Sequence, residues 1–197
     1  MSKKVIVVAS GNEGKIREFR QMLEPEGYTV KCLKDLQGYQ EPEETGTTFE
    51  ENAVIKAQAV TDQFGIEAIA DDSGIQIRAM NDEPGVHSAR WLGHDTPYTY
   101  KNQVVLENLK GASDRRCRYV CAIALTRPGQ EPVVFADTVD GEIAEAPKGE
   151  NGFGYDPIFY YPPLKKTMAE MTKEEKNSIS HRGKALRKLE NWLHEAH

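Results

Sequence analysis

Patterns typical of strands and of helices alternate along the first half of this 197-residue chain, and no other feature constrains its fold as strongly. Residues 4–9 form a short apolar run, as expected for a buried strand, and a loop of glycine and asparagine follows. Ile16, Phe19 and Leu23 then recur at helical spacing. The chain is therefore expected to begin with a strand, a polar loop and a helix.

The same alternation is expected between residues 47 and 79. Residues 47–50, Thr-Thr-Phe-Glu, have the form of a capping box, which would open a helix that runs to about Phe64. Residues 66–70 are a second short apolar strand. Residues 71–74, Asp-Asp-Ser-Gly, have turn composition and precede the alternating residues 75–79. We therefore predict a hairpin whose turn lies at residues 71–74.

The second half of the chain predicts one helix, a long hairpin and a C-terminal helix. Thr96-Pro97 is typical of a helix start and Gly111 of a helix end. Alternating residues 117–125, a turn at 127–130 and residues 133–139 form the hairpin pattern. The C-terminal helix is predicted from leucines at helical spacing, namely Leu186, Leu189 and Leu193.

These elements indicate an α/β or α+β fold with a mixed sheet. No internal repeat, low-complexity tract or linker composition interrupts the chain. A chain of this length can bury most of its apolar surface in one core. We therefore expect a single domain over residues 1–197.

Charge, hydropathy and cysteine usage exclude several classes of protein. The net charge of −6 argues against a protein that coats nucleic acid, which needs an extended basic surface. The longest aliphatic stretch near the start, residues 5–9, is too short to span a membrane. Cys32, Cys117 and Cys121 have no metal-ligand spacing, and Cys117 and Cys121 would lie about 13 Å apart on one strand, too far for a disulfide. We expect a cytoplasmic protein with no nucleic-acid or membrane partner.

The first candidate site is Ser-Gly-Asn-Glu-Gly-Lys at residues 10–15, between a strand and the start of a helix. Unpaired amides and the positive end of the helix dipole suit a phosphate there. The segment matches neither the dinucleotide-binding nor the P-loop pattern, and an ordinary turn is the alternative. Lys15 favours the phosphate, because a cation in the first helical turn opposes the dipole unless an anion accompanies it.

The second candidate site is a set of acids that precede one helix and follow one strand: Glu43, Glu44, Asp71 and Asp72. Hard oxygen ligands that leave positions for water and phosphate suit Mg²⁺. A hairpin turn at Asp71-Asp72 and favourable helix electrostatics at the glutamates explain the same residues equally well. Asn52 and Lys56 share one helix face, so Lys56 would reach a phosphate if Glu44 faces the same cleft.

The third and fourth candidates combine glycine, aromatic and basic residues. Residues 149–156 set aromatic side chains among glycines, which allows close approach to a ligand and stacking on a base; the alternative is core packing around a bulge. Lys176 precedes Ser-His-Arg-Gly at 180–183, which places His181 and Arg182 against a helix dipole. Such donors suit a keto oxygen on a base, and a basic surface patch is the alternative.

Seven short motifs occur together and cover nearly the whole chain. They are Ser-Gly-Asn-x-x-Lys at 10–15, Glu-Glu-Thr-Gly at 43–46, Phe49 with Glu51-Asn52-Ala53 and Lys56, Ala-Asp-Asp-Ser-Gly at 70–74, Pro84-Gly85 with Ser88-Ala89-Arg90, Phe-Gly-Tyr-Asp-Pro at 153–157, and Ser-His-Arg-Gly at 180–183. In this order they resemble the inosine triphosphate pyrophosphatase family, also called Ham1-like or dITP/XTP pyrophosphatases. Two departures are slight: Ser10 replaces a more usual threonine, and Trp91 a more usual tyrosine.

The resemblance implies a homodimeric α/β protein with an elongated mixed sheet flanked by helices and a central cleft between two lobes. It implies Mg²⁺-dependent hydrolysis of ITP, dITP, XTP and dXTP to the monophosphate and pyrophosphate. The residues that would hold the triphosphate are Ser10, Gly11, Asn12, Glu13, Gly14 and Lys15, assisted by Lys56. Glu44 and Asp72 would bind the metal, and Asp72 would also accept a proton. The residues that would contact the rest of the substrate, mainly its base and sugar, are Ser73, Phe153, Gly154, Tyr155, Asp156, Lys176, His181 and Arg182.

Two points stay open at this level. Asp71 and Asp72 are adjacent, so the sequence does not decide which is the general base, and no residue explains how guanine would be rejected. Two rival functions are a Maf-like pyrophosphatase that acts on pyrimidine triphosphates and a nucleotide sensor without turnover. The motifs at 153–157 and 180–183 count against the first, and paired acids around a metal count against the second.

Overall fold

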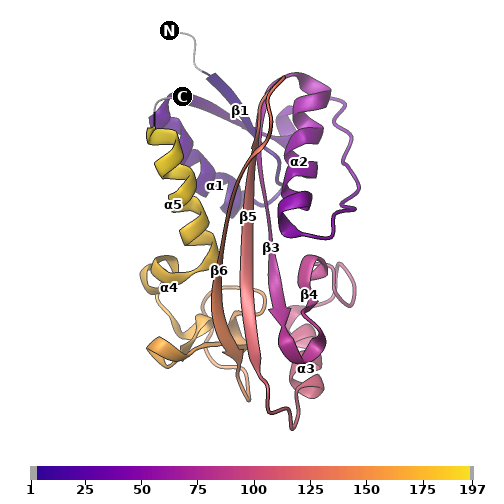
Figure 1. Cartoon of the computed structure of the whole chain (residues 1–197), viewed down its shortest axis with the longest axis vertical. Coiled ribbons are helices and arrows are strands. Elements are labelled where there is room, and N and C mark those ends of the chain that lie inside the picture. The colour runs from indigo at the N-terminus through magenta and orange to yellow at the C-terminus, as the bar shows by residue number, and fades with distance from the viewer. Residues whose placement is uncertain (1–3, 196–197) are drawn as a thin grey trace. The chain divides into compact units, whose positions relative to one another are not determined.

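The computed structural model describes residues 4–195, and their strands form one mixed sheet (Figure 1). The strand order is β2-β1-β3-β5-β6-β7-β8, and β4 pairs with β3. β1 runs parallel to β2 and β3, whereas β7 is antiparallel to β6 and β8. The strands are β1 Lys4–Val8, β2 Tyr28–Cys32, β3 Glu67–Ile77, β4 Glu83–Pro84, β5 Arg116–Thr126, β6 Val133–Ile143, β7 Phe159–Tyr161 and β8 Lys166–Thr167. The predicted α/β fold with a mixed sheet is confirmed.

Contacts divide the chain into two compact units. The first contains Met1–Asp72, Ala122–Ala136 and Ala185–His197, and the second contains Ser73–Cys121 and Asp137–Lys184. The α-helices are α1 Glu13–Leu23, α2 Phe49–Phe64, α3 Tyr98–Asn108, α4 Lys173–Ile179 and α5 His181–His194. The prediction that residues 1–197 form a single domain stays a prediction.

The first unit packs helices against its parallel strands. The last three residues of β1, at positions 6–8, are fully buried, and the predicted helical stripe of Ile16, Phe19 and Leu23 on α1 is buried as well. Figure 1 shows α1 and α5 on one side of the strands of this unit and α2 on the other. Both faces of β1 are therefore covered, as is usual for parallel strands.

The second unit has a core of its own. Its buried cluster includes Ile77 of β3, Val105 of α3, Tyr119 of β5 and Phe159 of β7. The rings of Tyr119 and Phe159 stack with centroids 4.3 Å apart. Cys117 and Cys121 are buried and, among the described residues, neither forms a disulfide, so packing accounts for both, as predicted.

The hairpin predicted at residues 71–74 is wrong. Asp71 and Asp72 lie within β3, a continuous strand of 11 residues. The turn-like composition of these residues does not produce a turn, because two lysines balance the negative charge of the carboxylates. Lys15 pairs with Asp71, and Lys56 pairs with Asp72. A strand can therefore carry both acids toward the interior.

Two predicted helix starts are displaced by one residue. The cap of α2 is Thr48, whose hydroxyl accepts from the amide of Glu51, and this places Phe49 in the core. The residue that precedes α3 is Pro97, without a side-chain cap, because the Thr96 hydroxyl donates to the carbonyl of Leu92. Both helices are present where the sequence predicts them.

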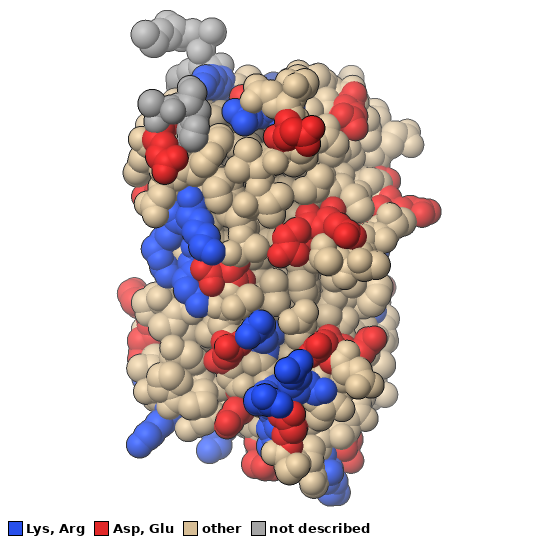
Figure 2. Space-filling model, viewed as in Figure 1, with Lys and Arg blue, Asp and Glu red and all other residues tan. Residues whose placement is uncertain are grey.

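Surface charge and hydropathy agree with the composition. In the part of the chain that the structure describes, no helix is long and apolar enough to cross a membrane. Acidic and basic side chains are interspersed on the face shown in Figure 2, and the described residues form no extended basic surface there.

Candidate active site

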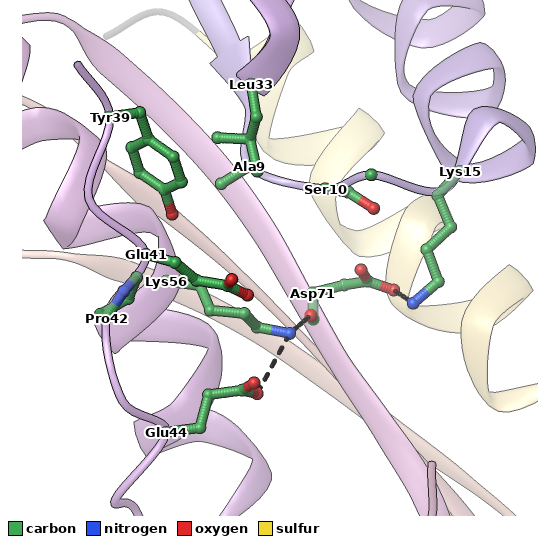
Figure 3. A pocket seen from close by; sticks show the side chains of 11 residues that line it. Ala9, Ser10, Lys15, Leu33, Tyr39, Glu41, Pro42, Glu44, Lys56 and Asp71 are labelled. Carbon is green, nitrogen blue, oxygen red and sulfur yellow. Dashed lines mark hydrogen bonds and ion pairs between the residues drawn. The ribbon is translucent and has the colours of Figure 1, made fainter. Parts of the chain in front are cut away.

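A cavity of about 190 Å³ lies in the first unit, where β1 and β2 end (Figure 3). The carboxyl ends of parallel strands are the usual place for a ligand in an α/β sheet. We call this cavity the acid–lysine pocket. Its lining residues are Ala9, Ser10, Gly11, Lys15, Leu33, Tyr39, Glu41, Pro42, Glu44, Lys56 and Asp71.

The loop after β1 brings part of the predicted phosphate segment to the pocket. Ser10, Gly11 and Lys15 line it. The Asn12 side chain instead caps α1 by accepting from the amide of Lys15, at 3.1 Å. Glu13 forms an exposed ion pair with Lys34, which lies in a short 3-10 helix after β2. The assignment of Asn12, Glu13 and Gly14 to the substrate stays a prediction.

Lys15 and Asp71 form an ion pair beside this loop. Lys15 Nζ lies 3.2 Å from Asp71 Oδ2, and the Asp71 side chain is only 2% exposed. A carboxylate buried this deeply is very costly without an opposite charge. A lysine in the first turn of a helix is favourable only when an anion lies beside it. For Lys15, the Asp71 carboxylate is that anion.

Lys56 of α2 joins the remaining acids. Its Nζ donates to the backbone carbonyl of Asp71 at 2.5 Å and lies 3.6 Å from Glu44 Oε1 and 3.7 Å from Asp72 Oδ1. Figure 3 shows Lys56 and Glu44 pointing toward one another from α2 and the segment before it. Glu44 and Asp72, which are far apart in the sequence, therefore both lie beside the ammonium group of Lys56.

Asp72 has an unusual environment within this group. Successive residues of a strand point to opposite faces, which agrees with Asp71 meeting Lys15 and Asp72 meeting Lys56. The Asp72 side chain is 12% exposed, and burial raises its pKa to about 6, although Lys56 acts to lower it. Glu44 and Asp71 raise the pKa further.

The donors present fit a hard divalent cation. Asp72 Oδ2 is buried and has no hydrogen-bond partner among the described residues, so it could accept a ligand. No group of three or more histidine, cysteine or acidic residues suited to a metal was found in residues 4–195. Mg²⁺ is commonly bound by one or two carboxylates with water and substrate phosphates, which agrees with a pair such as Glu44 and Asp72.

A buried asparagine fixes the segment that carries Glu44. Asn52 of α2 accepts from the Gly46 amide at 2.8 Å and donates to the Gly46 carbonyl at 3.4 Å. A Cβ at Gly46 would lie 2.6 Å from the Asn52 amide oxygen, so only glycine fits. The Glu-Glu-Thr-Gly motif and Asn52 therefore act together to hold Glu44 in place.

Four lining residues were not singled out from the sequence: Leu33, Tyr39, Glu41 and Pro42. Burial, and then the charges of Glu41 and Glu44, raise the pKa of the Tyr39 hydroxyl. The acidic residues at 41–44 could have indicated this part of the pocket, but the sequence analysis singled out only Glu43 and Glu44.

The second unit brings four predicted residues together with Tyr119, which was not predicted as a site residue. We call this group the aromatic cluster: Tyr119, Phe153, Asp156, Lys176 and His181. Buried Asp156 is its centre. Its carboxylate accepts from the Tyr119 hydroxyl at 2.9 Å, from the Phe153 amide at 3.1 Å and from Lys176 at 2.5 Å. A Cβ at Gly152 would collide with this carboxylate, which explains the glycine before Phe153.

The cluster presents a flat exposed ring beside a cation. The Phe153 side chain is 73% exposed, and Lys176 Nζ lies 4.8 Å from the ring centroid. His181, at the start of α5, stacks on Tyr119 at 4.7 Å. Tyr155 is buried, and its hydroxyl donates to the Ser88 carbonyl. The substrate roles of Ser73, Gly154, Tyr155 and Arg182 stay predictions.

The fold and the pocket define a mixed α/β protein with a cavity whose lysines suit a polyanion and whose acids suit a cation. The chain belongs to the Ham1 family, whose model matches residues 6–192. The resemblance carried by the seven motifs is thus confirmed.

Curated relatives and solved structures agree with this assignment. The dITP/XTP pyrophosphatase of Bacillus licheniformis is 47% identical over 98% of this chain and 100% of its own, and that of Bacillus subtilis is 47% identical over 96% and 97%. The Staphylococcus aureus Ham1 protein superposes with a TM-score of 0.92 at 45% identity, covering 96% of this chain and 98% of its own.

Proposed function

We propose that this chain removes non-standard purine nucleotides by hydrolysing ITP, dITP, XTP and dXTP, with Mg²⁺, to the monophosphate and pyrophosphate. Its curated relatives are dITP/XTP pyrophosphatases, and this chain is a nucleoside-triphosphate pyrophosphatase of the same class. One observation carries the proposal: Lys56 lies within 3.7 Å of both Glu44 and Asp72, beside a second lysine that pairs with the buried carboxylate of Asp71.

Charge balance supports a metal–triphosphate complex as the ligand of the acid–lysine pocket. Lys15 and Lys56 each contact a carboxylate. Triphosphate oxygens would give both lysines new anionic partners, and the accompanying cation would take over the carboxylates. The complex can therefore enter without leaving a buried charge unpaired.

Glu44 and Asp72 would hold the Mg²⁺. When bound, the ion supplies neutralisation of charge on the phosphate oxygens. Lys15 and Lys56 would orient the triphosphate and stabilise the charge that builds on the leaving group. Ser10 and Gly11 would bring the hydroxyl and the backbone of the loop near the phosphates.

Asp72 is the better candidate for the general base. Asp71 is held by the Lys15 ammonium, whereas Asp72 has a raised pKa of about 6, close to the range in which a base works well at neutral pH. Asp72 would take a proton from a water that attacks the α-phosphorus. The new oxygen–phosphorus bond forms as the bond from the α-phosphorus to the bridging oxygen breaks, and pyrophosphate leaves.

The aromatic cluster is proposed to contact the base. The exposed ring of Phe153 offers a face on which a purine could stack, and Lys176 with His181 and Arg182 offers donors for the oxygen at C6. Adenine carries an amino group there, so the same donors would stay unpaired, at a cost of about 1–3 kcal/mol per group. Asp156 would position both Lys176 and Phe153.

We infer two further properties from family resemblance: that the enzyme is a homodimer, and that it works in the cytoplasm. Light scattering coupled to size-exclusion chromatography tests the first, because the mass of one chain is 22.1 kDa. A single species at about that mass would contradict the dimer.

The bond that is cleaved can be located with oxygen-18 water. We expect the label in the nucleoside monophosphate when dITP is hydrolysed, because attack is at the α-phosphorus. Label found only in pyrophosphate would place attack at the β-phosphorus and contradict the proposal. Asp72→Asn should release at least about 100-fold less of either product than wild type.

A further inference from the structure

A second cavity, of about 160 Å³, lies at the amino ends of the parallel strands of the first unit. β1 begins at Lys4, which pairs in register with Tyr28 of β2, and Glu67 opens β3. The acid–lysine pocket lies at the other ends of β1 and β2 and shares no lining residue with it. Figure 1 shows the beginning of β1 close to the end of α5, which contributes Trp192.

Two buried polar atoms of this cavity lack partners. Glu67 Oε2 and Arg127 Nε are both buried, and neither has a hydrogen-bond partner among the described residues. The two atoms belong to side chains of opposite charge that line one cavity, and they do not hydrogen-bond to each other. Buried polar atoms in native proteins normally have partners, so both atoms call for a ligand or ordered water.

An aromatic ring and a tyrosine lie beside these two groups. Burial and then the charge of Glu67 raise the pKa of Tyr28 to about 12. The Arg127 guanidinium lies over the Trp192 ring, 5.4 Å from its centroid. Trp192 in turn contacts Phe135 edge to face, at 5.9 Å. The cavity is therefore lined by an acceptor, a donor that lies against an aromatic ring, and the rings of Tyr28 and Trp192. Its other charged lining residues are Lys4, Glu26 and Glu195.

We propose that this cavity binds a small planar heterocycle of the purine-base class, which donates a hydrogen bond to Glu67 and accepts one from Arg127. Such a ligand needs a donor next to an acceptor on one edge. Hypoxanthine has this edge in its ring N–H and carbonyl, and adenine in its amino group and ring nitrogen. Aromatic walls favour a flat molecule over an aliphatic one. The inference does not depend on the hydrolysis proposed for the other pocket.

The probe is the indole N–H signal of Trp192 in a proton–nitrogen correlation spectrum of the full chain. The chain has two tryptophans, so a Trp91→Phe variant identifies this signal. We expect hypoxanthine, adenine and 9-methylhypoxanthine to shift it saturably. 1,9-Dimethylhypoxanthine, which has no ring N–H donor, should bind at least about tenfold more weakly than 9-methylhypoxanthine, equivalent to 1.4 kcal/mol. This comparison uses one protein and does not depend on any variant folding.

Two variants test whether the ligand binds in this cavity. Glu67→Met should abolish the saturable shift, whereas Phe153→Ala, in the aromatic cluster, should leave it unchanged. A melting curve establishes that each variant is folded. If hypoxanthine causes no saturable shift, if 1,9-dimethylhypoxanthine binds as well as 9-methylhypoxanthine, or if Phe153→Ala rather than Glu67→Met removes the shift, the proposal is overturned. The first result would mean that the cavity holds water alone.

Discussion

Lys56 and Asp72 face one another across 3.7 Å, measured from Nζ to Oδ1, while the other oxygen of the Asp72 carboxylate is buried without a partner among the described residues. Lys56 alone does not offset the burial of Asp72, because the pKa of Asp72 stays raised at about 6. The metal-free protein thus holds a carboxylate that a proton or a cation would stabilise.

Replacement of Asp72 by asparagine should stabilise the metal-free protein at neutral pH. The folded pKa of about 6 exceeds an unfolded value of about 3.9, so between these values the folded state binds more protons than the unfolded state. Ionisation of Asp72 therefore lowers the free energy of unfolding as pH rises from about 4 to 6, by up to about 3 kcal/mol. Urea unfolding in EDTA measures this.

The quantity to follow is the free energy of unfolding of Asp72→Asn minus that of wild type. This difference should grow between pH 4 and 6 and stay constant above, because Asp72 is then ionised in both states of the wild type. A difference that does not change across this window would show that Asp72 has an ordinary pKa.

The pair of Lys15 and Asp71 should behave as a coupled unit. Lys15→Met leaves the buried Asp71 carboxylate without its ammonium partner and should lower the free energy of unfolding by about 2–3 kcal/mol. Adding Asp71→Asn removes the uncompensated charge. We expect the double variant to lose at least about 1 kcal/mol less than the two single losses together, whereas additive losses would contradict a direct interaction.

Neighbouring glutamates provide a matched test of the metal ligands. Glu44 contacts Lys56, whereas Glu43 is exposed. Glu44→Gln should therefore raise the Mg²⁺ concentration for half-maximal activity at least about tenfold, and Glu43→Gln should leave it within about twofold. Titration of activity with Mg²⁺ at fixed dITP measures both. Equal effects of the two substitutions would remove Glu44 from the metal site.

Much of the fold could be predicted because the spacing of apolar residues within a segment indicates whether that segment is a helix or a strand. The stripe of Ile16, Phe19 and Leu23 predicted α1, and the alternation in residues 117–125 predicted β5. The predicted start of α2 was wrong by one residue, because either of two adjacent threonines could have capped the helix. The cap is Thr48, which allows Phe49 to be buried.

The continuous β3 could not be predicted from its own residues. Two aspartates, a serine and a glycine favour a turn locally, and what overrides this preference is remote: Lys15 lies after β1 and Lys56 on α2. Because these lysines are far away in the sequence, it could not be predicted that Asp71 and Asp72 have different partners. Tyr39 and Leu33 were missed because an aromatic and an aliphatic side chain in a loop carry no chemical pattern that marks a pocket.

The aromatic cluster should control the choice of base. Lys176→Met removes the cation beside Phe153 and Asp156, so kcat/KM for dITP should fall at least about tenfold while that for dATP changes little. Lys173→Met, at an exposed position on the same helix, is the control. Steady-state kinetics with both substrates measure the ratio. An unchanged ratio in Lys176→Met would exclude Lys176 from base selection.

The central claim, that acids and lysines of one pocket drive pyrophosphate release from non-standard purine nucleotides, is tested most directly by product analysis. Wild-type protein with Mg²⁺ is incubated with dITP, XTP, dATP, dGTP and dTTP, and the products are separated by ion-exchange chromatography. We predict equal amounts of monophosphate and pyrophosphate from dITP and XTP, little from the others, and none in EDTA. Release of orthophosphate, or hydrolysis of dATP as fast as dITP, would contradict the account.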